Sequence, residues 1–143
     1  MKKSTLLAVT PYLADQQSLG DILRPHNWNV TSVRTWKEAR TFLSGANADV
    51  ILCESKLPDG MWRNLLNSLD TLRQHPPIVV MSRDADEGLW AEVLNLGGFD
   101  VLQKPFEEME VLRVAAMAQR HHERNANTES DSFVKAQEMA ATA

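Results

Sequence analysis

The stretch DVILCESKLPDG, residues 49–60, decides how the rest of the chain is interpreted. Residues Val50–Cys53 form an uninterrupted apolar run, which is typical of a parallel strand buried on both faces. The segment KLPDG, residues 56–60, then ends the strand, because Pro and Gly punctuate regular structure and Asp favours turns. Glu54 stands between strand and turn. Because ligands bind beyond the carboxyl ends of the strands in open parallel sheets, Glu54 is a candidate functional residue.

The composition is that of one ordinary globular domain. The chain has 143 residues, of which 43% are hydrophobic and 24% charged, enough for a single core. No apolar run approaches the ~20 residues of a membrane span, so no membrane association is expected. The single cysteine, Cys53, excludes an internal disulfide and any multi-cysteine metal site. That usage fits a reducing cytoplasm.

The charge is unevenly distributed along the chain. The net charge is −4, but residues 84–143 alone carry five Lys or Arg against twelve Asp or Glu, a net charge of −7. An acidic half repels phosphate backbones, so direct nucleic-acid binding is disfavoured. A basic protein surface is the more natural partner.

The hydrophobic pattern alternates between two periods. Apolar, often β-branched runs predict five strands, at 6–10, 28–33, 50–53, 78–81 and 99–103. Amphipathic segments predict five helices, at about 15–23, 35–45, 61–74, 84–96 and from 106 into the 120s. Asp15 is expected to cap the first helix, and Thr35 with Glu38 forms a capping box for the second. Five alternations predict a parallel sheet covered on both faces.

The last segment of the chain differs in composition from the rest. From Asn125 the sequence becomes polar and then Ala-rich. We expect a domain over residues 1–124, and over 125–143 a polar linker with a weak helix or disordered tail. Residues 125–143 are too short to fold a DNA-binding or enzymatic output domain of their own.

Polar groups follow three of the predicted strands. Glu54, Ser82 and Lys104 each come at or directly after the carboxyl end of a strand. Parallel strands end at the same edge of a sheet, so a carboxylate, a hydroxyl and an ammonium are expected to converge there. The sequence therefore predicts a small charged site.

Several motifs together resemble the receiver domain of bacterial two-component response regulators, over roughly residues 4–122. They are LCESKLPDG (52–60), VVMS (79–82) and NLGGFDVLQKPF (95–106), combined with the five-fold alternation. The resemblance implies a flavodoxin-like (βα)5 fold with strand order 2-1-3-4-5, and a cytoplasmic role in phosphorelay-type signal transduction. It also implies that Ser82 and Lys104 are the residues that bind phosphoryl oxygens, and that the Lys104–Pro105 peptide bond is a candidate for the cis form.

The chain departs from the family pattern at the positions that carry the chemistry. Glu54 occupies the phosphoacceptor position, where the family has Asp. Thr10 and Pro11 occupy the positions of the acidic pair that holds Mg²⁺, and Val101 replaces the switch aromatic. Because Mg²⁺ prefers carboxylate and water oxygens, we expect no metal, no other cofactor and no enzymatic activity.

Two interpretations of Glu54 remain open. The side chain, one methylene longer than Asp, either reaches Lys104 and Ser82 and imitates a phosphorylated aspartate, or forms a plain salt bridge with no signalling meaning. In both cases the site is locked rather than switched. We therefore predict a phosphorylation-independent interaction module that binds a protein partner. The broad apolar stripe of the last helix, residues 109–117, also makes a homodimer through the last helices plausible.

Two alternative functions compete with this prediction. A true phosphoacceptor would use Ser55, Asp59 or Glu54 itself, although Asp59 lies in a Pro-Asp-Gly turn and is read first as a turn residue. A small α/β enzyme or ligand-binding protein would use Glu54, Ser82 and Lys104 as acid/base, hydroxyl and anion clamp. Against the latter, no glycine-rich phosphate loop follows the first strand.

Overall fold

A five-stranded parallel sheet forms the centre of the molecule. The computed structural model describes residues 3–72 and 74–141, with side chains as far as Ala126. The sheet order is β2-β1-β3-β6-β7, with bounds β1 Ser4–Val9, β2 Trp28–Val33, β3 Val50–Glu54, β6 Ile78–Ser82 and β7 Asp100–Gln103. The short strands β4 (Lys56–Leu57) and β5 (Gly60–Met61) form a separate hairpin. Counting only the strands of the main sheet, this is the predicted order 2-1-3-4-5.

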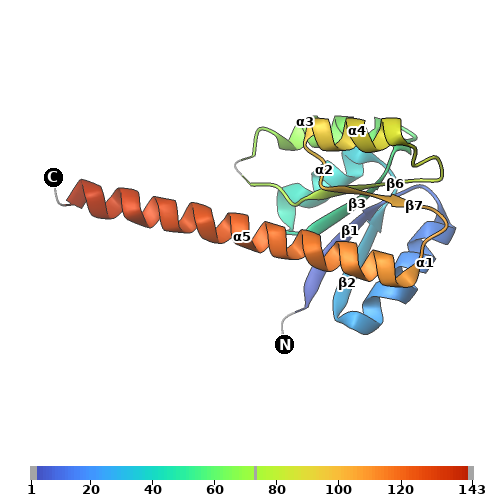
Figure 1. The fold of residues 1–143 in the computed structure, drawn as a ribbon, viewed down its shortest axis with the longest axis horizontal. Coiled ribbons are helices and arrows are strands. Elements are labelled where there is room, and N and C mark those ends of the chain that lie inside the picture. The colour runs from blue at the N-terminus through green and yellow to red at the C-terminus, as the bar shows by residue number, and fades with distance from the viewer. Residues whose placement is uncertain (1–2, 73, 142–143) are drawn as a thin grey trace.

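Helices cover both faces of the sheet, as Figure 1 shows. The helices are α1 (Leu13–Leu23), α2 (Trp36–Gly45), α3 (Trp62–Leu69), α4 (Glu87–Leu96) and α5 (Glu108–Ala141), with a 3-10 turn at Arg24–His26. Helices α1 and α5 pack on one face, whereas α2, α3 and α4 pack on the other. The result is the flavodoxin-like, doubly wound arrangement in three layers.

The central strand β3 explains why the sheet separates two apolar cores. All five of its residues are buried. Alternate side chains point to opposite faces, so Ile51 and Cys53 pack in the core with Trp62, whereas Val50 and Leu52 pack in the core under α1 and α5. A strand buried on both faces needs a continuous apolar run, which is the pattern that the sequence shows.

Three helix boundaries differ from the sequence-based expectation. Helix α3 ends at Leu69 rather than near residue 74, because Leu69 is its last buried residue and Leu72 is exposed. Helix α4 begins at Glu87 rather than at 84, since the Asp86 carboxylate accepts a hydrogen bond from Leu89 N (2.8 Å) and caps it there. Asp15 is not a cap: it lies inside α1 and is buried.

Helix α5 continues past Asn125, where the sequence predicts that a polar linker begins. It runs without interruption from Glu108 to Ala141 and projects beyond the body of the domain (Figure 1). No Gly or Pro occurs between these residues, and the polar residues there lower helix propensity by less than ~1 kcal/mol each, so nothing in the sequence forces a break. Across the described ranges, no helix combines the length and apolar character needed to cross a membrane.

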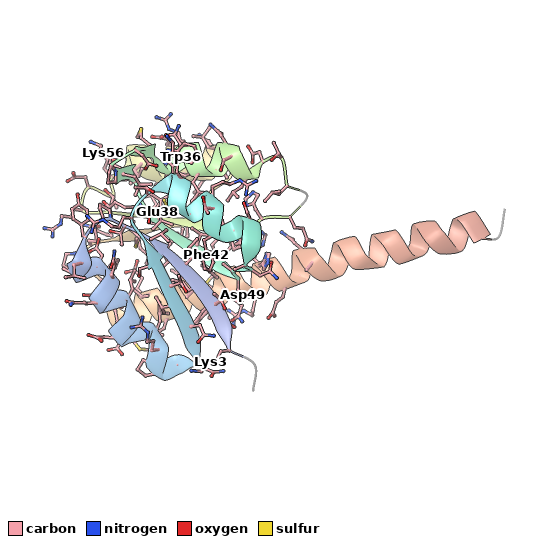
Figure 2. The ribbon with its side chains drawn as sticks, turned by 180° about the vertical axis from the view of Figure 1, so that it is seen from behind. Lys3, Trp36, Glu38, Phe42, Asp49 and Lys56 are labelled. Atoms are coloured by element: carbon pink, nitrogen blue, oxygen red, sulfur yellow. The ribbon has the colours of Figure 1, made fainter. Side chains whose placement is uncertain are left out.

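The two edges of the sheet carry different side chains. Figure 2 shows Trp36 and Lys56 near the carboxyl edge, and Lys3 and Asp49 near the opposite edge. The candidate site lies at the carboxyl edge, because β3, β6 and β7 run in the same direction and end in register there.

Candidate functional site

The structure brings Glu54 and Lys104 into direct contact. Glu54 ends β3 and Lys104 follows β7, and Lys104 Nζ lies 2.7 Å from Glu54 Oε2. The two groups form a salt bridge at this distance, although they are not aligned as a regular hydrogen bond. Both side chains are almost completely buried, at 5% and 9% exposure. Little solvent is therefore available to screen the pair.

A third ionic group, Asp15, completes the site. Lys104 Nζ donates a hydrogen bond to Asp15 Oδ2 at 2.9 Å, and the Thr10 hydroxyl donates to the same oxygen at 3.0 Å. Sequence reasoning missed this role because it assigned Asp15 to the helix cap. The available signal was a carboxylate in the first turn of the helix after β1. Helical side chains tilt toward the N-terminus, so a residue there points back at the sheet edge.

One ammonium thus lies between two carboxylates, and the pKa shifts follow from that arrangement. Burial raises the pKa of Glu54 above its ordinary value; Lys104 opposes this effect and the charge of Asp15 adds to it. For Lys104, burial lowers the pKa, but the contacts with Glu54 and Asp15 outweigh burial and hold its pKa above the ordinary value. A cation with two anionic neighbours stays charged, whereas an anion with one cation and one anion beside it is only partly compensated.

Ser82 is buried at the end of β6, but its hydroxyl is used elsewhere. Ser82 Oγ accepts a hydrogen bond from Asp84 N (3.1 Å). The hydroxyl therefore stabilises the turn after the strand and does not bind Glu54 or Lys104. Ser82, Glu54 and Lys104 nevertheless line one shallow pocket of about 360 Å³, together with Tyr12 and Arg83. Of the three predicted side chains, Glu54 and Lys104 are therefore in direct contact, whereas the Ser82 hydroxyl only lines the same pocket.

The positions that depart from the family pattern are well packed. Thr10 is fully buried, and Val101 is part of the apolar core. Pro11 precedes α1 and is partly exposed. The Lys104–Pro105 peptide bond is cis, as the resemblance to receiver domains implied.

Asp59 has a defined structural task. Its carboxylate accepts hydrogen bonds from Trp36 N and Lys37 N, both at 3.1 Å, and its carbonyl oxygen accepts one from Trp36 Nε1 at 3.0 Å. These backbone N–H groups are in the first turn of α2 and have no partner within the helix. Asp59 therefore ties the β4–β5 hairpin to α2.

Other potential reactive groups lie outside this site. Cys53 is buried, and burial together with the negative charges of Glu54 and Asp59 raises the pKa of its thiol, which keeps it protonated and unreactive. Among the described side chains, which are those of residues 3–72 and 74–126, no group of three or more His, Cys, Asp or Glu is arranged to hold a metal ion.

The fold and the site define a class of α/β protein that has a charged site at the carboxyl edge of its parallel sheet. The family described as "Response regulator receiver domain" matches residues 14–116. This chain belongs to that family of receiver domains.

Individual relatives agree with the family match. The chain is 31% identical to "Probable transcriptional regulatory protein TcrX" of Mycobacterium tuberculosis over 112 residues, which is 77% of this chain and 47% of the relative. It is 26% identical to "Transcriptional regulatory protein FixJ" of Rhizobium meliloti over 96 residues, covering 65% and 47%. The chain therefore matches about half the length of these curated relatives.

A solved structure supports the fold. The receiver domain of the Francisella response regulator 1452 has a TM-score of 0.74 and 23% identity, covering 83% of this chain and 99% of that one. At this identity the similarity is evidence for the fold alone.

Proposed function

We propose that this receiver domain acts as a phosphorylation-independent, non-enzymatic interaction module in two-component signalling. The observation that supports the proposal most is the position of the Lys104 ammonium, 2.7 Å from Glu54 and 2.9 Å from Asp15. The cation that would receive an incoming phosphoryl oxygen already has two internal anions as partners.

The chemistry of phosphoryl transfer argues in the same direction. Transfer relies on cations that neutralise charge on the phosphoryl oxygens, and here the one buried ammonium of the site is compensated from inside. A magnesium ion does not fit the donor set, because both carboxylates face the ammonium and Thr10 and Pro11 offer no further carboxylate. We therefore propose that the domain uses neither Mg²⁺ nor an aspartyl-phosphate cycle.

A locked site still transmits information if a partner recognises the conformation that it holds. The Glu54–Lys104 contact joins the ends of β3 and β7, and Asp15 joins them to α1. These connections hold three elements of one edge in a single arrangement. We propose that a partner with a basic surface binds this arrangement, since the second half of the chain is strongly acidic.

The direct test is intact mass after incubation with acetyl phosphate and Mg²⁺. The proposal predicts no added phosphoryl group on the wild-type chain, with an authentic aspartate receiver as the positive control in the same buffer. A stable adduct would overturn it and would return the domain to the phosphorelay. Glu54→Gln, Ser55→Ala and Asp59→Asn variants would then identify the acceptor.

The homodimer through the last helices, which the apolar stripe at residues 109–117 suggests, has a separate test. Sedimentation velocity on the full chain, over a hundredfold range of concentration, measures self-association directly. A concentration-dependent shift that disappears when the exposed residue Met117 is changed to Glu would support contact through α5. A monomer at every concentration would exclude the homodimer and leave the interaction proposal to a different protein.

A further inference from the structure

Tyr12 lies directly over the ion-pair site. The Lys104 ammonium is 4.7 Å from the centroid of the Tyr12 ring, a distance at which a cation is attracted to the face of an aromatic ring. Lys104 is only 6% exposed, whereas Tyr12 is 53% exposed. The ring therefore separates a buried charge from solvent and is itself in contact with solvent.

The backbone of Tyr12 is connected to the same site. Tyr12 N donates a hydrogen bond to Thr10 Oγ1 (3.2 Å), and this hydroxyl donates in turn to Asp15 Oδ2, the oxygen that Lys104 contacts. Both the ring and the main chain of Tyr12 thus depend on where the ammonium and the Asp15 carboxylate lie. The neighbouring Leu13 is 64% exposed and makes no such contact among the described interactions.

We propose that Tyr12 is a positioning residue of this site. Its ring holds the Lys104 ammonium against Glu54 and Asp15 and shields it from water, and its exposed edge carries the state of the buried ion pair to the surface. Removing the Lys104 ammonium by mutation should therefore move this exposed aromatic side chain. The coupling between the ring and the ion pair does not depend on which partner the domain binds.

Shielding is tested from the lysine side by limited acetylation with acetic anhydride, followed by peptide mass analysis. Removing the ring in Tyr12→Ala should raise the rate at Lys104 roughly two- to five-fold relative to the exposed Lys56, the size expected of one cation–ring contact. Tyr12→Phe should retain the wild-type rate because it keeps the ring. Leu13→Ala is the matched control and should change nothing.

The same experiment can overturn the proposal. Equal Lys104 rates in wild type and Tyr12→Ala, or an equal increase in Leu13→Ala, would show that the ring does not shield the ammonium. Tyr12 is largely exposed, so its replacement is not expected to unfold the domain, and an amide spectrum of each variant checks this.

Coupling is tested from the tyrosine side. Tyr12 is the single tyrosine of the chain, so labelling with 3-fluorotyrosine gives one fluorine resonance. Lys104→Met should shift this resonance toward its position in the unfolded chain. Lys37→Met, which removes an ammonium lying 5.9 Å from the Trp36 ring instead, should leave it in place. An unchanged resonance in a folded Lys104→Met protein would refute the coupling.

Discussion

Lys104 Nζ lies 2.9 Å from Asp15 Oδ2, although the two residues are 89 positions apart in the sequence. This contact changes the meaning of the Glu54–Lys104 pair, because it places one cation between two carboxylates. The ammonium occupies the space between the two carboxylates, which is the kind of place where a metal ion binds in other proteins. The charge of the Lys104 ammonium is therefore balanced within the protein, and the two carboxylates together carry more charge than the one ammonium neutralises.

Replacing Lys104 should be costly. Lys104→Met leaves two buried carboxylates without their cation, and breaking a buried pair in this way typically costs about 3–5 kcal/mol of unfolding free energy. Urea denaturation at pH 7 measures the loss. The double variant Lys104→Met with Glu54→Gln should recover part of it, because it also removes one of the stranded charges. Lys37→Met on the surface should stay within ~0.5 kcal/mol of wild type, and a similar loss there would contradict the argument.

Replacing Glu54 should change how stability depends on pH. The raised pKa of Glu54 means that the folded state binds its proton more tightly than the unfolded state does. The stabilisation that Glu54 gives the folded state is therefore fully present below the unfolded-state pKa of about 4.3, and it is lost as the pH rises through the folded-state pKa. Glu54→Gln carries no titrating group, so its stability relative to wild type should increase across that window.

Denaturant titrations at several pH values from 4 to 8 would follow this difference. A relative stability of Glu54→Gln that falls with rising pH would show the opposite sign, namely that Lys104 lowers the pKa of Glu54 more than burial raises it. Asp21→Asn, on the exposed surface of α1, is the control for a general charge effect.

Removing the ammonium should also create affinity for a divalent cation. In Lys104→Met, Glu54 and Asp15 present two free carboxylates, which are the ligands that hard cations prefer. Mn²⁺ should then broaden amide signals near Glu54 and Asp15, and Mg²⁺ should raise the melting temperature. Wild type should show neither effect. Adding Asp15→Asn to the variant should abolish both, and broadening of equal size in wild type would contradict the role assigned to Lys104.

Asp59 should matter for stability rather than for chemistry. Asp59→Ala removes the acceptor of two backbone N–H groups at the start of α2, and loss of such capping bonds costs about 1–2 kcal/mol. Asp59→Asn keeps one side-chain oxygen and should lose less. Thermal unfolding followed by circular dichroism measures both, and a neutral Asp59→Ala would show that the hairpin does not stabilise the helix.

The sequence by itself determined the architecture. The apolar run before Glu54 is typical of a strand buried on both faces, and the five-fold alternation predicted a parallel sheet covered on both faces. The resemblance to receiver domains supplied the strand order. The capping box of Thr35 and Glu38 also fixed the start of α2, since Thr35 Oγ1 accepts from Glu38 N at 3.1 Å. These features depend on residues close together in the chain, or on the period of their hydrophobicity.

Only the tertiary structure decided which polar groups meet. Asp15 is an acidic residue in a helical first turn, and local sequence cannot tell a cap from a side chain that contacts a lysine 89 residues away. The same holds for Asp59, whose partners lie 23 and 22 residues earlier, and for Ser82, whose hydroxyl serves its own turn. Charge compensation depends on distances between segments that are far apart in the chain. The contact of one ammonium with two carboxylates therefore follows from the way the folded sheet brings β3, β7 and α1 together.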